Sequence, residues 1–318
     1  MSGAQLEGDD LELFERSLRA ATEQHTGDAL DAAVAELGWG DALAFDTRAA
    51  VSRRFELQGE ACARSSALDR VLAFAIGWEL DGDTAVVLPP VGSMEAPGAG
   101  IDASVSVRGF TTGARGSLLV VASTEDGTSA ALVDAGALET RAVHGIDPDL
   151  GLIEVHGEVT LADAAPVDWI AGVQLAQLAL GHELVGVSRH ALALAREHAL
   201  ERIQFDQPIA KFQAVRHRLA DTLVAIETAV AVLDAAWLDP TPVTAAMAKA
   251  TAGRSARLAA KHCQQVLAGI GFTDEHDLHR FLRRIWTLDQ LFGPSAVLTK
   301  RLGQDLLVSR ELPPLLPL

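Results

Sequence analysis

Hydrophobic residues recur every three or four positions in the first and last parts of the chain, and this spacing predicts helices. Leu11, Phe14 and Leu18 form one such apolar stripe near the N-terminus. After Pro166, which can occupy a first helical turn, the periodic segments become longer and breakers become rare. Four long helices that pack as an antiparallel bundle are predicted over residues 166–199, 208–239, 244–268 and 278–307.

The middle of the chain follows a different pattern. Short runs rich in β-branched residues alternate with glycine and proline, as is typical of strands joined by turns. Their spacing predicts a small antiparallel sheet or barrel. The runs are Thr84–Leu88, Ala103–Val107, Ser117–Ala122, Ala130–Val133 and Leu152–Val155.

These zones predict an α+β fold that is mostly α. The predicted domains are a short helical N-domain over residues 1–77, a β-sheet or barrel domain over 78–165, and a C-terminal four-helix bundle over 166–318. With 318 residues and 49% hydrophobic content, the chain can bury substantial cores.

Composition and charge limit the expected location of the protein and the partners it can bind. A net charge of −17 argues against nucleic acid, because phosphates attract lysine and arginine. No apolar run of about 18 residues is unbroken, and the acidic N-terminus lacks the features of a signal peptide, so neither a membrane span nor secretion is expected. Cys62 and Cys263 form no disulfide framework. The predicted location is the cytoplasm.

Two segments of the predicted bundle carry recognisable motifs. Residues 201–213 read E-R-I-Q-F-D-Q-P-I-A-K-F-Q, and residues 265–272 read Q-V-L-A-G-I-G-F. Together they resemble the flavin-binding signature of the acyl-CoA dehydrogenase family. The resemblance covers about residues 175–292 most strongly, and it implies that family's order of helical, β and four-helix domains, with the N-domain shortened here.

The resemblance implies that these motifs bind FAD. Arg202 matches the arginine that contacts the pyrophosphate, and a guanidinium suits that role because its fork matches phosphate oxygens. Phe205 matches the aromatic residue at the flavin cleft, and Gln213 matches the following glutamine. Gln265 and Gly269 match residues that approach the adenosine end from a neighbouring subunit. Ala268 departs from the first glycine of the family's pair.

The catalytic base of the family is missing from both of its usual positions. A glutamate normally lies 27 residues after the glutamine of the second motif, where this chain has Phe292. A minority of the family places the base 26 residues before the flavin arginine, where this chain has Ala176, followed by Gln177. Neither phenylalanine nor alanine can take up a proton.

Other polar residues offer weaker candidates. Asp289 and Glu183 lie near the empty positions and could substitute as a base, although Asp289 fits a helix-capping or solvated position better. The cluster Asp274-Glu275-His276-Asp277 with His279 could bind a metal, but a polar loop explains it better. His182 and His190 fit polar or interface positions. Residues 92–100 differ from the family's flavin-contacting segment and are predicted to form a flexible connection.

The retained flavin motifs and the missing base resemble the short, base-less subunit of actinobacterial steroid-degrading acyl-CoA dehydrogenases. The resemblance implies an α2β2 heterotetramer in which a second chain supplies the base. It also implies an acyl-CoA substrate derived from a steroid such as cholesterol, and an acceptor like electron-transfer flavoprotein. Two alternatives stay open: a flavin monooxygenase on the same fold, and a purely structural subunit.

Overall fold

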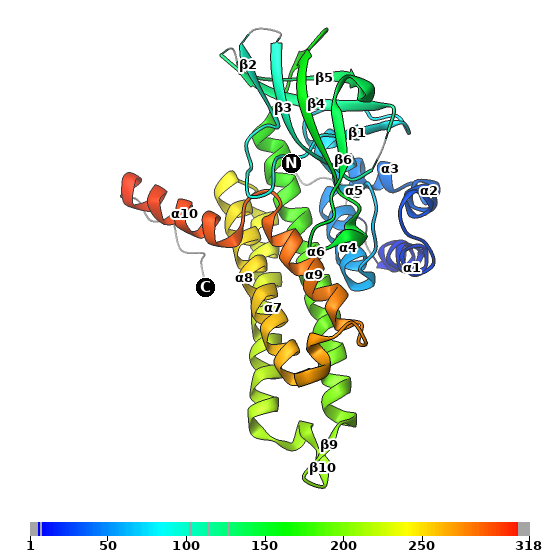
Figure 1. Ribbon diagram of the computed structural model, residues 1–318, viewed down its shortest axis with the longest axis vertical. Coiled ribbons are helices and arrows are strands. Elements are labelled where there is room, and N and C mark those ends of the chain that lie inside the picture. Colours follow the sequence, from blue (N-terminus) through cyan, green and yellow to red (C-terminus); the bar gives the residue numbers. More distant parts are fainter. Residues whose placement is uncertain (1–5, 7, 102–103, 114, 126, 311–318) are drawn as a thin grey trace.

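The computed structural model describes residues 6, 8–101, 104–113, 115–125 and 127–310. Helices at both ends of the chain flank a central run of strands (Figure 1). The N-terminal helices are α1 (Gly8–Gln24), α2 (Asp28–Glu36), α3 (Trp39–Phe45), α4 (Thr47–Ala61) and α5 (Ala67–Ala75). The C-terminal helices are α6 (Trp169–Glu201), α7 (Gln213–Leu238), α8 (Pro242–Leu267), α9 (Leu278–Gln290) and α10 (Ser295–Ser309). The predicted mostly helical α+β fold is confirmed.

Strands β1 to β8 form one mixed sheet, so the predicted antiparallel sheet is wrong where β1 and β2 pair with β4 and right for the other strand pairs. The path through the sheet is β6-β7-β3-β2-β4-β5-β8, and β1 pairs with β4 beside it. Both β1 and β2 run parallel to β4, β1 beside residues 117–119 of that strand and β2 beside residues 122–123. The bounds are β1 (Thr84–Val86), β2 (Gly98–Ile101), β3 (Ser104–Thr111), β4 (Ser117–Thr124), β5 (Gly127–Asp134), β6 (Glu139–Ala142), β7 (Ile153–Thr160) and β8 (Ala165–Pro166).

Residues 92–100 are not a simple flexible connection, because Gly98–Ile101 forms β2. A Cβ at Gly98 would lie 2.7 Å from the Cβ of Ala122 in the neighbouring strand. Glycine therefore allows close strand approach at this position.

Two predicted helix starts at prolines are wrong, and one predicted helix is two helices in the structure. Pro166 ends β8, and α6 begins after Asp168, whose carboxylate accepts a hydrogen bond from the Ala171 N–H at 3.1 Å. Pro208 belongs to a small hairpin rather than to a helix. The predicted fourth helix is α9 and α10, separated where Phe292 and Gly293 adopt positive φ angles of 52° and 97°.

Helix α6 is the centre of the C-terminal bundle, and it packs against α7, α8 and α9 as well as α4 and α5. It is long and apolar enough to cross a membrane by length and composition, yet 72% of its most apolar window is buried in the protein. Close contact with α4 depends on Gly59 and Gly186, where a Cβ would lie 2.2 Å and 2.0 Å from the carbonyl oxygens of Glu183 and Glu56.

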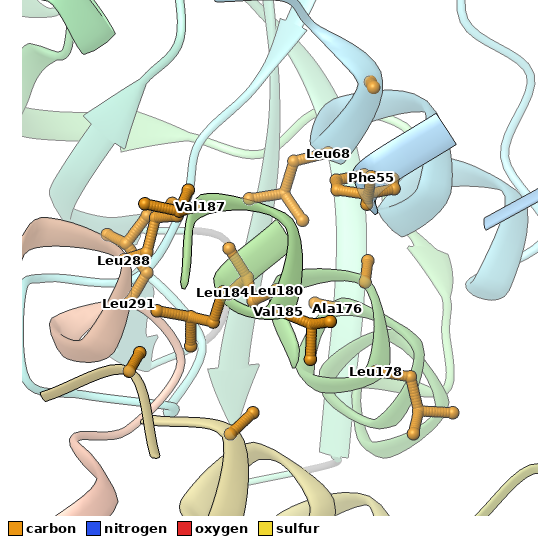
Figure 2. Close-up of a cluster of buried hydrophobic side chains, with 14 of the residues drawn as sticks. Phe55, Leu68, Ala176, Leu178, Leu180, Leu184, Val185, Val187, Leu288 and Leu291 are labelled. Carbon is orange, nitrogen blue, oxygen red and sulfur yellow. The ribbon is translucent and has the colours of Figure 1, made fainter. Parts of the chain in front are cut away.

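One hydrophobic core joins the two helical regions. It contains buried residues from α4, α5, α6 and α9, and Figure 2 shows part of this cluster, with Phe55, Leu68, Leu184 and Leu288 labelled. A smaller apolar cluster lies on the other face of the sheet. The domain boundaries at residues 77/78 and 165/166 stay a prediction.

Candidate functional site

The first flavin motif lies at the far end of α6, where the chain turns into the hairpin of β9 (Ile203–Gln204) and β10 (Gln207–Pro208). Arg202 ends the helix: its N–H donates to the His198 carbonyl, and its own carbonyl accepts the Ile209 N–H at 2.9 Å. The backbone of Arg202 thereby closes the hairpin. Its side chain is exposed and has no partner among the described residues.

Phe205 lies at the tip of this hairpin. It has a positive φ of 52°, and its residue is 85% exposed. The Phe205 ring contacts Phe212 edge to face, with centroids 6.0 Å apart. Gln213, also exposed, is the first residue of α7. The end of α6, the hairpin and the start of α7 thus present an arginine, an aromatic ring and an amide to the outside of the molecule.

The second motif covers the end of α8 and the short 3-10 helix Ala268–Phe272. Gln265 and Gly269 are both exposed, and a Cβ built on Gly269 meets no atom within 4 Å. The amide of Gln264 donates to the Gly271 carbonyl at 3.2 Å, which fixes the turn. The space beside Gly269 is therefore open to a ligand or a neighbouring chain.

Both motifs lie at the same end of the bundle (Figure 1). His198, one turn before Arg202, contacts His276 with ring centroids 6.4 Å apart. The start of α7 meets the end of α8 where the His262 ring lies 3.1 Å from the Thr222 hydroxyl. The structure therefore places the two sequence segments at one end of the bundle, each with polar groups exposed.

Replacing Ala268 by glycine is expected to stabilise the chain by about 1 kcal/mol. Ala268 has φ 52° and ψ −131°, a conformation that glycine adopts with less strain. Urea unfolding of Ala268→Gly measures the gain. The control is Ala259→Gly inside α8, which should instead destabilise by more than about 1 kcal/mol, because the cost of glycine in a helix adds to the loss of a buried methyl group. A loss of stability at both positions would contradict the assignment of strain to Ala268.

The two usual base positions lie close together and are filled by apolar side chains. Phe292 is 1% exposed and Ala176 is 0% exposed. Next to Ala176, the Gln177 amide donates to the Phe292 carbonyl at 3.1 Å, and the Trp169 ring lies 6.2 Å from the Phe292 ring. Figure 2 shows Ala176 within the apolar cluster of α6.

A mainly apolar cleft of about 260 Å³ adjoins this filled site. Trp169 and Gln177 line it together with Met94, whose carbonyl accepts the Trp169 indole N–H at 3.0 Å. Glu95, Arg301 and Asp305 supply its titratable groups. The sequence offered no signal for this cleft, because its residues come from α6, α8, α10 and the segment before β2 and share no motif.

The carboxylates of Asp289 and Glu183 serve the fold. Asp289 is 1% exposed: one oxygen accepts the Ser295 N–H at the start of α10, and the other lies 3.3 Å from Arg257. Its carbonyl accepts the Lys249 ammonium at 3.1 Å, and burial lowers the pKa of Lys249 to about 8. Glu183 is 2% exposed, and burial raises its pKa. Neither faces the cleft beside Phe292.

The histidines and the acidic loop also have structural partners. His182 lies 2.9 Å from Glu56 and accepts the Trp237 indole N–H at 3.0 Å, so both ring nitrogens are engaged. His190 stacks on Phe281 with centroids 4.2 Å apart. Among the residues that the structure describes, no group of histidine, cysteine or carboxylate side chains could hold a metal.

Residues 170–307 match the protein family described as acyl-CoA dehydrogenase, C-terminal domain. This part of the chain is an acyl-CoA dehydrogenase C-terminal domain. The chain is 34% identical over 178 residues to the acyl-CoA dehydrogenase IpdE2 of Mycobacterium tuberculosis, covering 56% of this chain and 55% of IpdE2. It is 40% identical over 151 residues to FadE34 of the same organism, covering 42% of this chain and 21% of FadE34. The matches span about half or less of these relatives.

Solved structures show that the acyl-CoA dehydrogenase fold extends beyond this domain. A variant of the Tcur3481-Tcur3483 steroid ACAD has a TM-score of 0.78 at 23% identity, covering 95% of this chain and 99% of that chain. The ChsE4-ChsE5 complex from Mycobacterium tuberculosis has a TM-score of 0.75 at 21% identity, covering 97% and 99%. A Mycobacterium smegmatis glutaryl-CoA dehydrogenase in complex with FADH2 has a TM-score of 0.74 at 14% identity, covering 95% of each chain.

Proposed function

We propose that this chain is the base-less subunit of a heteromeric, FAD-dependent acyl-CoA dehydrogenase that desaturates an acyl-CoA thioester between its α and β carbons. The observation that carries the proposal is the contrast between the two sites. Arg202 and Gln265 are exposed at one end of the bundle, whereas the usual base positions, Phe292 and Ala176, are buried and apolar.

The exposed residues fit the FAD role that their motif implies. Arg202 has a guanidinium free to meet phosphate oxygens, Phe205 presents a ring face, and Gly269 leaves room for close approach. Gln213 and Gln265 add exposed amides. A bound flavin would accept the hydride that leaves the β-carbon. This chain's part is to hold the phosphates and the adenosine end, while the ring contacts and base come from a partner.

Exposed apolar side chains on α7, α8 and α10 support a partner chain. Single exposed leucines are ordinary on a protein surface, but these exposed apolar residues are concentrated on three helices of the bundle. They are Leu223, Val224, Leu238, Val243, Met247, Val297, Leu306, Leu307 and Val308, and each is at least 41% exposed. A second, base-containing acyl-CoA dehydrogenase chain is the proposed occupant, in an α2β2 assembly located in the cytoplasm.

The proposed substrate is a steroid-derived acyl-CoA, and the proposed electron acceptor resembles electron-transfer flavoprotein. The steroid assignment is supported by the sequence resemblance to steroid-degrading relatives and by the steroid ACAD among the similar folds. Co-expression tests the assembly: this chain is produced alone and beside a candidate partner, and flavin absorbance and mass are measured. We expect yellow protein only from co-expression; a yellow, active homo-oligomer of this chain would refute the proposal.

Replacing Arg202 by glutamine is expected to weaken FAD binding by about tenfold to a hundredfold, as loss of one charge-assisted hydrogen bond would do. The co-expressed complex is gel-filtered, and its flavin content and dehydrogenase rate are measured. Arg16→Gln, an exposed arginine on α1, is the control and should keep full flavin. Unchanged flavin and rate in the Arg202 variant would favour a purely structural subunit.

A further inference from the structure

A cleft of about 430 Å³ lies among the N-terminal helices and contains none of the flavin-motif residues. Residues of α2, α3 and α5 and of the segment up to Leu80 form its sides, and Arg54 of α4 reaches it from within. Its apolar wall consists of Val34, Trp39, Leu43, Phe74, Trp78 and Leu80. Such a wall offers a large contact area to an apolar ligand.

Arg54 is a buried cation without a partner. The residue is 1% exposed, and none of its three guanidinium nitrogens has a hydrogen-bond partner within the described chain. The neighbouring carboxylates give it no hydrogen bond, and Oε1 of Glu183 itself has no hydrogen-bond partner within the described chain. Both oxygens of Asp31 accept the Ser66 N–H at 3.0 Å, and Glu183 lies 3.5 Å from Arg284.

The charge of Arg54 persists at neutral pH. Burial lowers its pKa to about 10, while Asp31 and Glu183 act in the opposite direction. A buried, unpaired guanidinium is strongly unfavourable, so a bound anion would stabilise the folded chain. Carboxylate and phosphate oxygens both match the guanidinium fork, and a carboxylate carries the smaller negative charge.

We propose that this cleft binds a monocarboxylic acid with an apolar body, its carboxylate on Arg54 and its body against Trp39, Phe74 and Trp78. One negative charge suits the site because its lining carries two cations, Arg54 and Arg70, against the two carboxylates Asp31 and Asp41. The Arg70 guanidinium already donates to the Leu80 and Asp81 carbonyls. The guanidinium nitrogens are closed to solvent, so the inner wall moves as the ligand enters. This inference is independent of the proposed flavin role.

Octanoate is the probe, titrated onto the full chain in the form in which it purifies, and the readouts are tryptophan fluorescence and the thermal midpoint. Octanoate should give a saturable fluorescence change and raise the midpoint. Acetate, which lacks the body, and 1-octanol, which lacks the charge, should bind at least tenfold more weakly. Arg54→Met keeps an unbranched apolar stem and should weaken octanoate binding at least tenfold.

Arg53→Met is the matched control. Arg53 is the neighbour of Arg54 in sequence, but its guanidinium lies outside the cleft, 3.4 Å from the Glu15 carboxylate. It should bind octanoate normally. Trp78→Ala keeps Arg54 and should weaken the binding of octanoate but not that of acetate. This variant tests the apolar wall even if Arg54→Met does not fold. Equal responses to octanoate and 1-octanol, equal responses to octanoate and acetate, or full octanoate binding by both cleft variants would each overturn the proposal.

Discussion

Replacing Arg284 by alanine is expected to destabilise the folded chain by about 3–5 kcal/mol, the usual effect of removing one partner from a buried ion pair. Arg284 lies on α9 and is 0% exposed at its side chain. Its Nε donates to Asp147 at 2.5 Å and its Nη1 donates to the Ala63 carbonyl at 2.8 Å. Glu183 of α6 lies 3.5 Å from the same group.

The effect is large because alanine would leave two carboxylates buried without their cation. Asp147 follows β6 and is 8% exposed, and Glu183 is 2% exposed with a pKa already raised by burial. Arg284 also connects α9 with the end of α4, the sheet and α6. Its loss therefore affects contacts between segments that are distant in the sequence.

Chemical unfolding in urea at pH 7 measures the loss, and the neighbouring arginine gives a matched control. Arg283 pairs with Asp274 at 2.9 Å, but the two side chains are 36% and 76% exposed. Such a surface pair contributes about 0–1 kcal/mol. Arg283→Ala should therefore change stability little. Similar losses for the two variants would show that burial of Arg284 does not set its contribution.

The fold was largely predictable from spacing because helical periodicity and β-branched runs survive in the final structure. The break between α9 and α10 was not, since Leu288, Leu291 and Leu298 keep helical spacing across it. The interruption comes from backbone geometry at Phe292 and Gly293, both at positive φ. Periodicity describes which side chains are buried, and it does not detect a short turn that preserves the same buried face.

The sequence could predict the residues of one site but not those of the other. The motif residues, such as Arg202 and Gln265, could be predicted because each motif is a short segment with a recognisable spacing. The cleft beside Trp169 and the charges of Arg54 and Arg284 could not, because each depends on distant segments meeting. Arginine is usually exposed, so composition alone gives no reason to expect two such residues in the interior.

Ionisation of Asp69 should lower the free energy of unfolding by up to about 4 kcal/mol as the pH rises from about 4 to 7. Asp69, on α5, is 1% exposed. One of its oxygens accepts the Val86 N–H at 3.2 Å and the Thr112 hydroxyl at 3.1 Å, and the other has no partner within the described chain. Burial raises the pKa of Asp69 from 3.8 to about 7, which outweighs those two hydrogen bonds.

The direction follows from proton binding. Between about pH 4 and 7 the folded chain keeps a proton on Asp69 that the unfolded chain has released, so raising the pH favours unfolding. Asp69→Asn keeps an acceptor for Val86 and Thr112 but cannot ionise. The difference between the urea stabilities of the two proteins, measured from pH 4.5 to 8, removes the contribution of other titrating groups. The original protein should lose stability relative to the variant across this range and level off above pH 7; parallel curves would mean that Asp69 is already ionised in the folded chain.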